Sequence, residues 1–143
     1  MLRHRSQQGS VLVEFAVVAM LVFTVLFGLI EMGMLLKDVT VLNEAVRQGA
    51  RVAAIGGTTA TVQATVINAA VTLNSANMAF SWRYNSTPTG ATYPNIMGDA
   101  AGQNNAPSGR LIRIGVIYQR RWLTHFIFKG NKQMSASCIV RRE

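Results

Sequence analysis

A long apolar run near the N-terminus is the feature that most restricts how this chain can fold. Residues 15–30 (FAVVAMLVFTVLFGLI) carry no charge, and extension to residues 11–36 adds only Glu14 and Glu31. An α-helix needs about 20 predominantly apolar residues to cross a bilayer. No other segment of the chain has this composition, so the sequence predicts a single membrane span.

The residues that flank the run predict its orientation. Arg3 and Arg5 precede it, and basic flanks remain on the cytoplasmic side, so the rest of the chain is expected outside the cytoplasm. A cleaved secretory signal is the alternative interpretation. However, the run is longer than the core of a usual signal, and it is followed by GLIEMGMLLK, which contains no small-x-small cleavage site. We therefore expect the span to be retained.

The helix is predicted to continue well beyond the membrane. Apolar or small residues recur there at alternating spacings of three and four, which is a heptad pattern: Met32, Leu35, Val39, Leu42, Val46, Gly49 and Ala53. The first helix-breaking pair is Gly56 and Gly57, so we predict one helix over residues 10–55. The stripe can pack against the protein's own outer domain, against related helices of other chains, or against both.

The remainder of the chain predicts a small domain. Thr58 or Thr59 can cap a second helix in TATVQATVINAAVTLN. Alternating apolar residues predict three strands, in MAFSWRY, RLIRIGVIYQRRW and QMSASCIVRRE. A connection rich in Asn, Gly, Pro, Ser and Thr (residues 85–109) separates the first two strands. The last two, joined by LTHFIFKGN, should pair antiparallel. The predicted fold class is α+β: a long N-terminal helix, half of it transmembrane, packs with the second helix against a small three-stranded antiparallel sheet.

The composition offers little for catalysis or metal binding. The only histidines are His4 and His125, and the only acids outside the first helix are Asp99 and Glu143. These residues cannot form a metal-ligand cluster or a nucleophile–base set, and there is no phosphate-binding loop. We predict no catalytic residue, no metal site and no cofactor. The single cysteine, Cys138, cannot form an internal disulfide and is interpreted as a small apolar residue of the last strand.

The C-terminal part of the chain is strongly basic. Residues 110–143 contain Glu143 as their only acid and eight bases: Arg110, Arg113, Arg120, Arg121, Lys129, Lys132, Arg141 and Arg142. The candidates for a basic surface are Arg120, Arg121, Arg141 and Arg142. Such a surface can be simply solvated, can contact an acidic partner, or can bind nucleic acid, with bases stacked on Trp122 and Phe126. Nucleic acid is the least favoured of the three.

The N-terminal motif resembles the processing site of type IV prepilins. Gly9 is followed by SVLVEF and the apolar run. The segments GLIEMG and VLNEAVRQGARVAAIGG, and a last strand that ends in Arg-Arg-Glu, look like those of TadE-like pseudopilins of the tight-adherence (Tad, Flp) pilus system. The resemblance covers nearly the whole chain. It is best at residues 9–57 and loose between residues 76 and 109.

This resemblance implies a pilin-like fold and specific residue roles. A prepilin peptidase would cut between Gly9 and Ser10, which leaves Glu14 as the fifth residue of the mature chain, followed by Phe15. A carboxylate at membrane depth costs about 2.5–3.5 kcal/mol, and the resemblance implies that Glu14 meets the new N-terminal amine of a neighbouring subunit during assembly. The implied segments are a cytoplasmic leader (1–9), the transmembrane part of the helix (10–36), its extracytoplasmic continuation (37–57) and the α+β domain (58–143).

The expected function is therefore that of a structural minor subunit in assembly of the Tad pilus for adherence. The implied partners are a prepilin peptidase, other pilin or pseudopilin subunits, the assembly platform and the membrane. The implied location is the bacterial inner membrane, single-pass, with incorporation into the pilus left open. Two alternatives remain: a minor pseudopilin of a type II secretion system, and a membrane-anchored extracytoplasmic binding module.

Overall fold

The structure is a computed structural model that describes residues 4–122 and 130–143, with side chains from residue 9 onward. It confirms the α+β fold class. The helices are α1 (His4–Ala54), α2 (Thr59–Ala69) and the short 3₁₀ turn η1 (Ser75–Asn77). The strands are β1 (Met78–Tyr84), β2 (Asn95–Ile96), β3 (Asp99–Ala100), β4 (Gln103–Asn104), β5 (Leu111–Arg121) and β6 (Asn131–Arg141).

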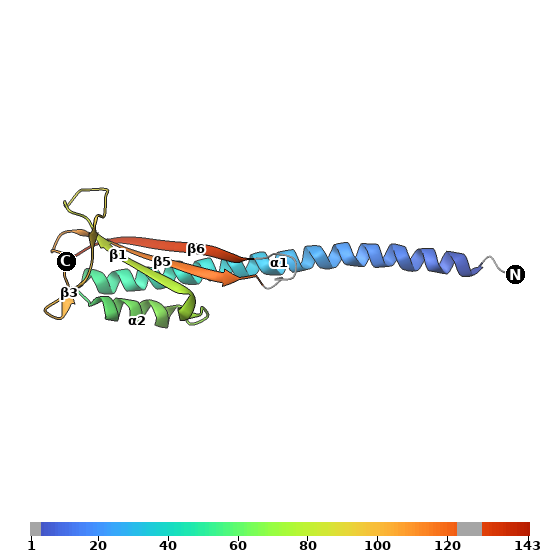
Figure 1. Cartoon of the computed structure of the whole chain (residues 1–143), viewed down its shortest axis with the longest axis horizontal. Coiled ribbons are helices and arrows are strands. Elements are labelled where there is room, and N and C mark those ends of the chain that lie inside the picture. Colours follow the sequence, from blue (N-terminus) through green and yellow to red (C-terminus); the bar gives the residue numbers. More distant parts are fainter. Residues whose placement is uncertain (1–3, 123–129) are drawn as a thin grey trace.

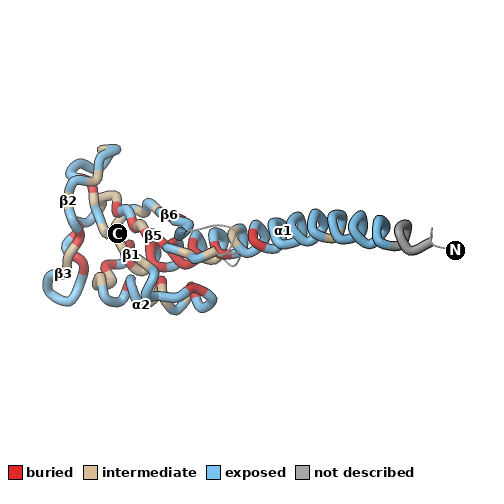
Figure 2. The backbone as a smooth tube through the Cα atoms, turned by 45° about the vertical axis from the view of Figure 1, so that its right-hand side comes forward, coloured by how far each residue is buried: buried red, intermediate tan, exposed pale blue. Residues whose placement is uncertain are grey.

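Helix α1 runs through the whole molecule as one uninterrupted rod (Figure 1). It begins at His4 rather than at the expected Ser10, because no helix-breaking residue separates the two and a glycine at position 9 costs only about 1 kcal/mol. No side chain is buried between residues 9 and 30, and the first buried one is Glu31 (Figure 2). The N-terminal half of α1 therefore projects from the domain, while its C-terminal half is part of the domain.

The main sheet has four strands, in the order β2-β1-β5-β6, and every pairing is antiparallel. The prediction of three strands is wrong, because it missed the two-residue strand β2. This strand lies in the irregular connection and pairs with the end of β1 (Arg83↔Ile96). Strands β3 and β4 form a separate ribbon in the same connection. The expected antiparallel pairing of the last two strands is confirmed. Most of the link between them (residues 123–129, with His125 and Phe126) lies outside the described residues.

The core lies between the two helices and the inner face of the sheet. Alternation along the long strands turns the even-numbered side chains inward, so that Ile112, Ile114 and Val116 of β5 are fully buried. Cys138 is half-buried beside this core in β6, as expected of a small apolar residue. Leu42 and Val46 show that the helical stripe packs against the protein's own domain. Nearer the apolar half, Leu35 of the stripe is partly buried against the core, whereas Met32 and Val39 remain exposed, so the domain covers only part of the stripe there.

Two caps end one helix and start the next. The backbone N–H groups of Gly56 and Gly57 donate to Ala53 and Val52 at 3.1 and 2.9 Å, and Gly56 has a positive φ of 89°, as in a Schellman motif. The predicted stop is thereby confirmed. Thr58 is the N-cap of α2, and its hydroxyl accepts from the Thr61 N–H at 3.2 Å. The chain can therefore reverse between the helices within a few residues.

Candidate assembly site on the long helix

The residues predicted for processing and assembly all lie on the projecting half of α1. Gly9, Ser10, Glu14 and Phe15 are exposed. A Cβ atom at Gly9 would meet no other atom within 4 Å, so none of the described residues packs against the helix at this position. Residues 10 and 14 are one helical turn apart and share one face. A new amine on Ser10 would therefore lie on the same side of the helix as the Glu14 carboxylate.

The projecting half is apolar around its whole circumference. An 18-residue window within Gly9–Ala54 has a mean hydropathy of 2.6 and none of it is buried. Large side chains on every side of the rod are exposed, among them Phe15 at 71%, Met20 at 74% and Leu29 at 65%. Residues 9–30 span about 33 Å at 1.5 Å per residue, close to the roughly 30 Å of bilayer hydrocarbon. This helix is long and apolar enough to cross a membrane.

A group of charges marks the end of this apolar half, and we call it the membrane-end cluster: Glu31, Asp38 and Arg120. Arg120 reaches from the end of β5 to α1, where its Nη1 donates to Asp38 Oδ2 at 2.6 Å. Its Nη2 lies 3.9 Å from Glu31 Oε1 and 3.3 Å from the sulfur of Met34. The side chains of Arg120, Asp38 and Glu31 are only 12%, 10% and 4% exposed. The cluster therefore joins the sheet to the helix where the apolar half ends.

The membrane-end cluster was not predicted, although two patterns in the sequence indicate it. Glu31 and Asp38 are seven residues apart, so they lie on one face of the helix, and that face continues through Ala45. Arg120 follows Tyr118 in the inward-facing, even-numbered series of β5. An arginine on an apolar face needs an acid opposite it. Together these patterns could have predicted the contact.

A second group of contacts holds the far end of α1. Asn104 Nδ2 donates to the carbonyls of Ala53 and Gly57 at 2.9 and 3.0 Å, and the Glu143 N–H donates to Ala54 at 3.0 Å. Arg142 binds the Asn104 carbonyl and side-chain oxygens and the Ala106 carbonyl at 2.8 Å. Carbonyls at a helix C-terminus lack partners within the helix. Asn104 and the Glu143 N–H supply donors to those of Ala53 and Ala54, and Arg142 holds Asn104 in place. We call Asn104 and Arg142 the distal clamp.

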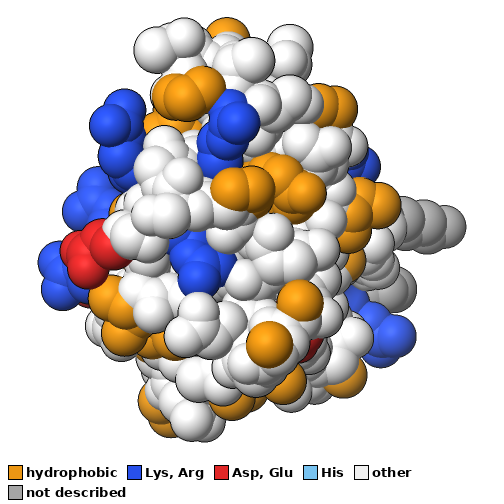
Figure 3. Space-filling view, turned by 90° about the vertical axis from the view of Figure 1, so that its left-hand side faces the viewer, with side chains coloured by type: hydrophobic (Ala, Val, Ile, Leu, Met, Phe, Trp, Pro, Cys, Tyr) orange, Lys and Arg blue, Asp and Glu red, His pale blue; other side chains and the backbone are white. Residues whose placement is uncertain are grey.

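The four arginines predicted as a basic surface are not brought together. Arg120 belongs to the membrane-end cluster and Arg142 to the distal clamp, whereas Arg121 and Arg141 are exposed. The two pairs lie at opposite ends of the β5–β6 ladder, about 30 Å apart at 3.4 Å per residue. On the distal end, basic side chains (blue) are spread among apolar and neutral ones, with an acidic group (red) beside them (Figure 3).

Among the residues that the structure describes, no group of three or more His, Cys, Asp and Glu side chains could hold a metal ion. Asp99 is used structurally, since its carboxylate accepts from the Thr59 N–H and hydroxyl at 2.7 Å each. A carboxylate at the first turn of α2 also interacts favourably with the helix dipole.

These features define the class: an α+β protein with one helix that can span a membrane and that continues without a break into the folded domain. Residues 9–51 match the model of the family described as TadE-like protein, and over this segment the match confirms the resemblance inferred from the sequence. Pilins of this family are structural components of pili and not enzymes. No curated protein and no solved structure matches the chain. The matched segment contains the span and most of α1, and it ends before α2 and the sheet.

Proposed function

We propose that this protein is a structural minor subunit, a pseudopilin, in assembly of the Tad pilus for adherence. The observation that carries the proposal is the form of α1: an apolar rod that begins with Gly9-x4-Glu14 and is fixed to a compact domain. The TadE-like match begins at the same glycine. Such a rod can be held by lipid before assembly and by neighbouring helices afterwards.

The physics of the apolar half supports this exchange. Lipid tails and the apolar side chains of other helices offer similar surroundings, so apolar burial gives little preference for either. Polar groups at membrane depth then decide the outcome. Glu14 forms no ion pair with any residue that the structure describes. An amine on Ser10 of a neighbouring subunit would supply one after cleavage, and an unpaired subunit would keep the cost of its carboxylate.

We also propose the arrangement in the bacterial inner membrane. The N-terminus is cytoplasmic, the domain is extracytoplasmic, and the bilayer ends near Glu31. The sequence-based boundary at residue 36 is later than this. The earlier boundary is supported by the burial of Glu31 under the domain and by the contact of Arg120 with residues 31–38, because a later boundary would place these charges in hydrocarbon.

Intact mass and direct N-terminal reading of the protein from its native membranes test the proposal. We expect a chain that begins at Ser10, and we expect a Gly9→Leu variant to begin at Met1, because a bulky residue blocks the peptidase. Gly28→Ala is the matched control, since a Cβ atom there also meets nothing within 4 Å, and it should be cut normally. A wild-type chain that begins at Met1 in cells with an active prepilin peptidase would contradict the proposal and favour an anchored binding module.

A further inference from the structure

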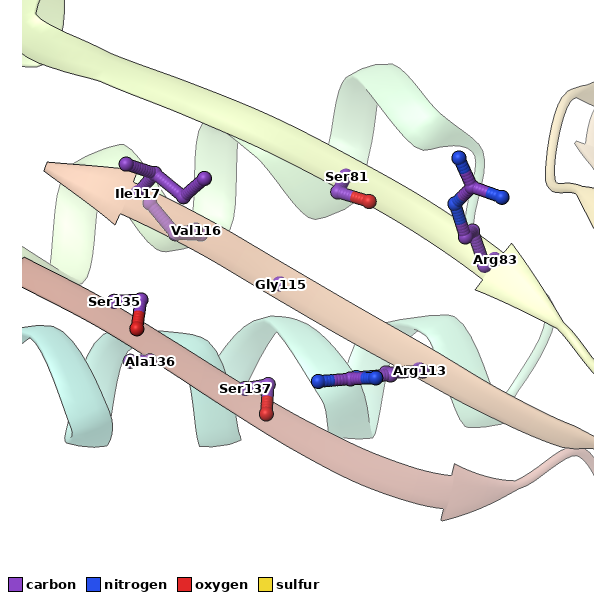
Figure 4. Close-up of a pocket in the computed structure, with 9 residues that line it drawn as sticks. All are labelled: Ser81, Arg83, Arg113, Gly115, Val116, Ile117, Ser135, Ala136 and Ser137. Carbon is purple, nitrogen blue, oxygen red and sulfur yellow. The ribbon is translucent and has the colours of Figure 1, made fainter. Parts of the chain in front are cut away.

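The outer face of the sheet, which is turned away from both helices, contains a hollow at its centre (Figure 4). Gly115 of β5 forms the floor, with Ser81 of β1 and Ser137 of β6 directly opposite it in the strand register. Larger side chains two residues away along β5, Arg113 and Ile117, bound the hollow on either side. Its volume is about 330 Å³, enough for a side chain or two from another molecule.

The fold itself does not require a glycine at position 115. Its φ is not among the positive values of this chain, and a Cβ atom would meet Ser81 only at 3.7 Å, an ordinary contact. Glycine in the interior of a strand weakens the strand, and it often marks a place where a ligand or another backbone approaches closely. The absence of a side chain at position 115 therefore leaves space for a group of another molecule.

The charge around the hollow indicates what can approach. Arg83 lies directly opposite Arg113 in the β1–β5 register, an arrangement that is unfavourable for like charges. Both are exposed, and neither forms an ion pair within the part of the chain that the structure describes. No acid is present at any outward-facing position of β1, β5 and β6. In Figure 4 the guanidinium of Arg113 points toward Ser137. Among the residues that the structure describes, these two guanidinium groups and the serine hydroxyls around the hollow have no acceptor opposite them.

We propose that this hollow binds a carboxylate side chain of an acidic peptide segment in a partner protein. Guanidinium groups bind carboxylates through charge-assisted hydrogen bonds. Nucleic acid is disfavoured because the aromatic rings of β1 (Phe80, Trp82 and Tyr84) belong to the inner face, which leaves no ring to stack a base in the hollow. A second copy is a poor source of the acid because the chain has a formal net charge of +8. This inference goes beyond the proposed function and can be tested without a pilus.

The test measures binding of fluorescein-labelled decaglutamate to the full chain in nonionic detergent micelles by fluorescence anisotropy. Arg83→Ala and Arg113→Ala should each weaken binding about tenfold, because each removes one charged donor. Gly115→Val should weaken it more than tenfold and leave the melting temperature unchanged or higher, since valine favours strands. Gly115→Ala is the milder variant of the same change. Lys132→Ala, which removes an exposed charge of β6 outside the hollow, should change binding less than twofold.

Three results would overturn the proposal. One is the absence of binding by the wild-type protein. Another is equal binding by wild type and Gly115→Val, or a loss of binding in Lys132→Ala as large as that in the two arginine variants. Either result would mean that binding depends only on general charge attraction. The third is tighter binding of a ten-nucleotide single-stranded DNA that is lost in the same arginine variants, which would assign the hollow to phosphate.

Discussion

Arg120 reaches from the end of β5 to Asp38 and Glu31 of α1, at the point where the apolar half of the helix ends. A buried group of this kind is weak evidence for stability, because the desolvation of its members offsets their attraction. Its main effect is to select one position of α1 relative to the sheet. A shift of α1 by one residue would rotate Asp38 by about 100° and leave both it and Arg120 without a partner. The cluster therefore fixes where along the helix the domain sits.

Replacement of Arg120 tests the membrane-end cluster. In Arg120→Met, the nearly buried Asp38 carboxylate loses the guanidinium that donates to it at 2.6 Å, and we expect the free energy of unfolding to fall by about 3 kcal/mol. Thermal unfolding in detergent micelles, followed by tryptophan fluorescence, measures the change.

Arg121→Met is the matched control for that change. Arg121 is the next residue of β5 and is exposed, so its replacement should change stability by less than about 0.5 kcal/mol. Equal stability of the two variants would mean that the cluster contributes nothing. In the double variant with Asp38→Asn, the loss should be smaller than the sum of the two single losses, because the residues are in contact.

At the scale of elements, the packing of the two helices depends on one missing side chain. A Cβ atom at Gly49 would lie 2.4 Å from Val66 Cγ2 and 3.5 Å from the Val62 carbonyl. Both valines are fully buried, so neither has room to move away. Close approach of the helix backbones is what allows α2 to complete the core between α1 and the sheet.

Alanine at position 49 should therefore destabilise the domain. Gly→Ala in a helix ordinarily stabilises by about 1 kcal/mol, but overpacking here costs about 1–3 kcal/mol, so we expect a net loss. Gly33→Ala is the control on the same helix, since its Cβ atom would meet nothing within 4 Å, and it should be neutral or slightly stabilising. Denaturant unfolding of both variants gives the comparison, and a more stable Gly49→Ala protein would contradict the close crossing.

Local sequence patterns predicted the elements that are locally encoded. Alternation in MAFSWRY and in the two later strands gave the inner face of the sheet, and Gly56-Gly57 gave the end of α1. Strand β2 was missed because its two residues carry no pattern of their own, and only their pairing with Arg83 and Tyr84 makes them a strand. The contact of Asp38 with Arg120 joins residues 82 positions apart. Nothing local encodes such a partner, and only the two face patterns together would have indicated it.

The two candidate sites also differ in how far local sequence indicates them. The proposed processing motif could be predicted from the sequence because Gly9 and Glu14 are close together in a linear pattern. The hollow around Gly115 could not, because it needs the register that places Ser81 and Ser137 on either side of that glycine.

At the scale of the whole molecule, α1 joins two parts of different character, because its apolar half is suited to a membrane and the domain has a core of its own. The first is exposed along its full length in the isolated chain, and the second is closed around its own core. An assembled state must cover the apolar half with something other than lipid once it leaves the bilayer. In the assembly proposed above, Glu14 would be the residue that distinguishes a correctly placed neighbour from lipid, because it lies within this half.

Loss of that carboxylate should separate processing from assembly. We expect Glu14→Ala to be cut after Gly9 and to remain in the membrane, but to be reduced more than tenfold in sheared pilus fractions, because the pair with a neighbouring amine is absent. If the protein remains at the assembly platform, the number of pili per cell should fall instead. Immunoblotting of both fractions and counting by electron microscopy measure the two effects. Glu44→Ala, an exposed acid of α1 beyond the apolar half, is the control, and indistinguishable behaviour of the two variants would remove Glu14 from assembly.

The rest of the domain holds α1 at two widely separated places. Arg120 of β5 binds Asp38 where the apolar half ends, and Asn104 of the β3–β4 ribbon, which Arg142 holds in place, binds the carbonyl of Ala53 at the far end. In mechanical terms the helix and the sheet act as one beam. A force on the domain along the helix axis would act on the β5–β6 pairing and on both contact groups at once, as a shear force. The contacts would then have to break together and not one after another. The apolar segment would then follow the domain out of the bilayer as a stiff body.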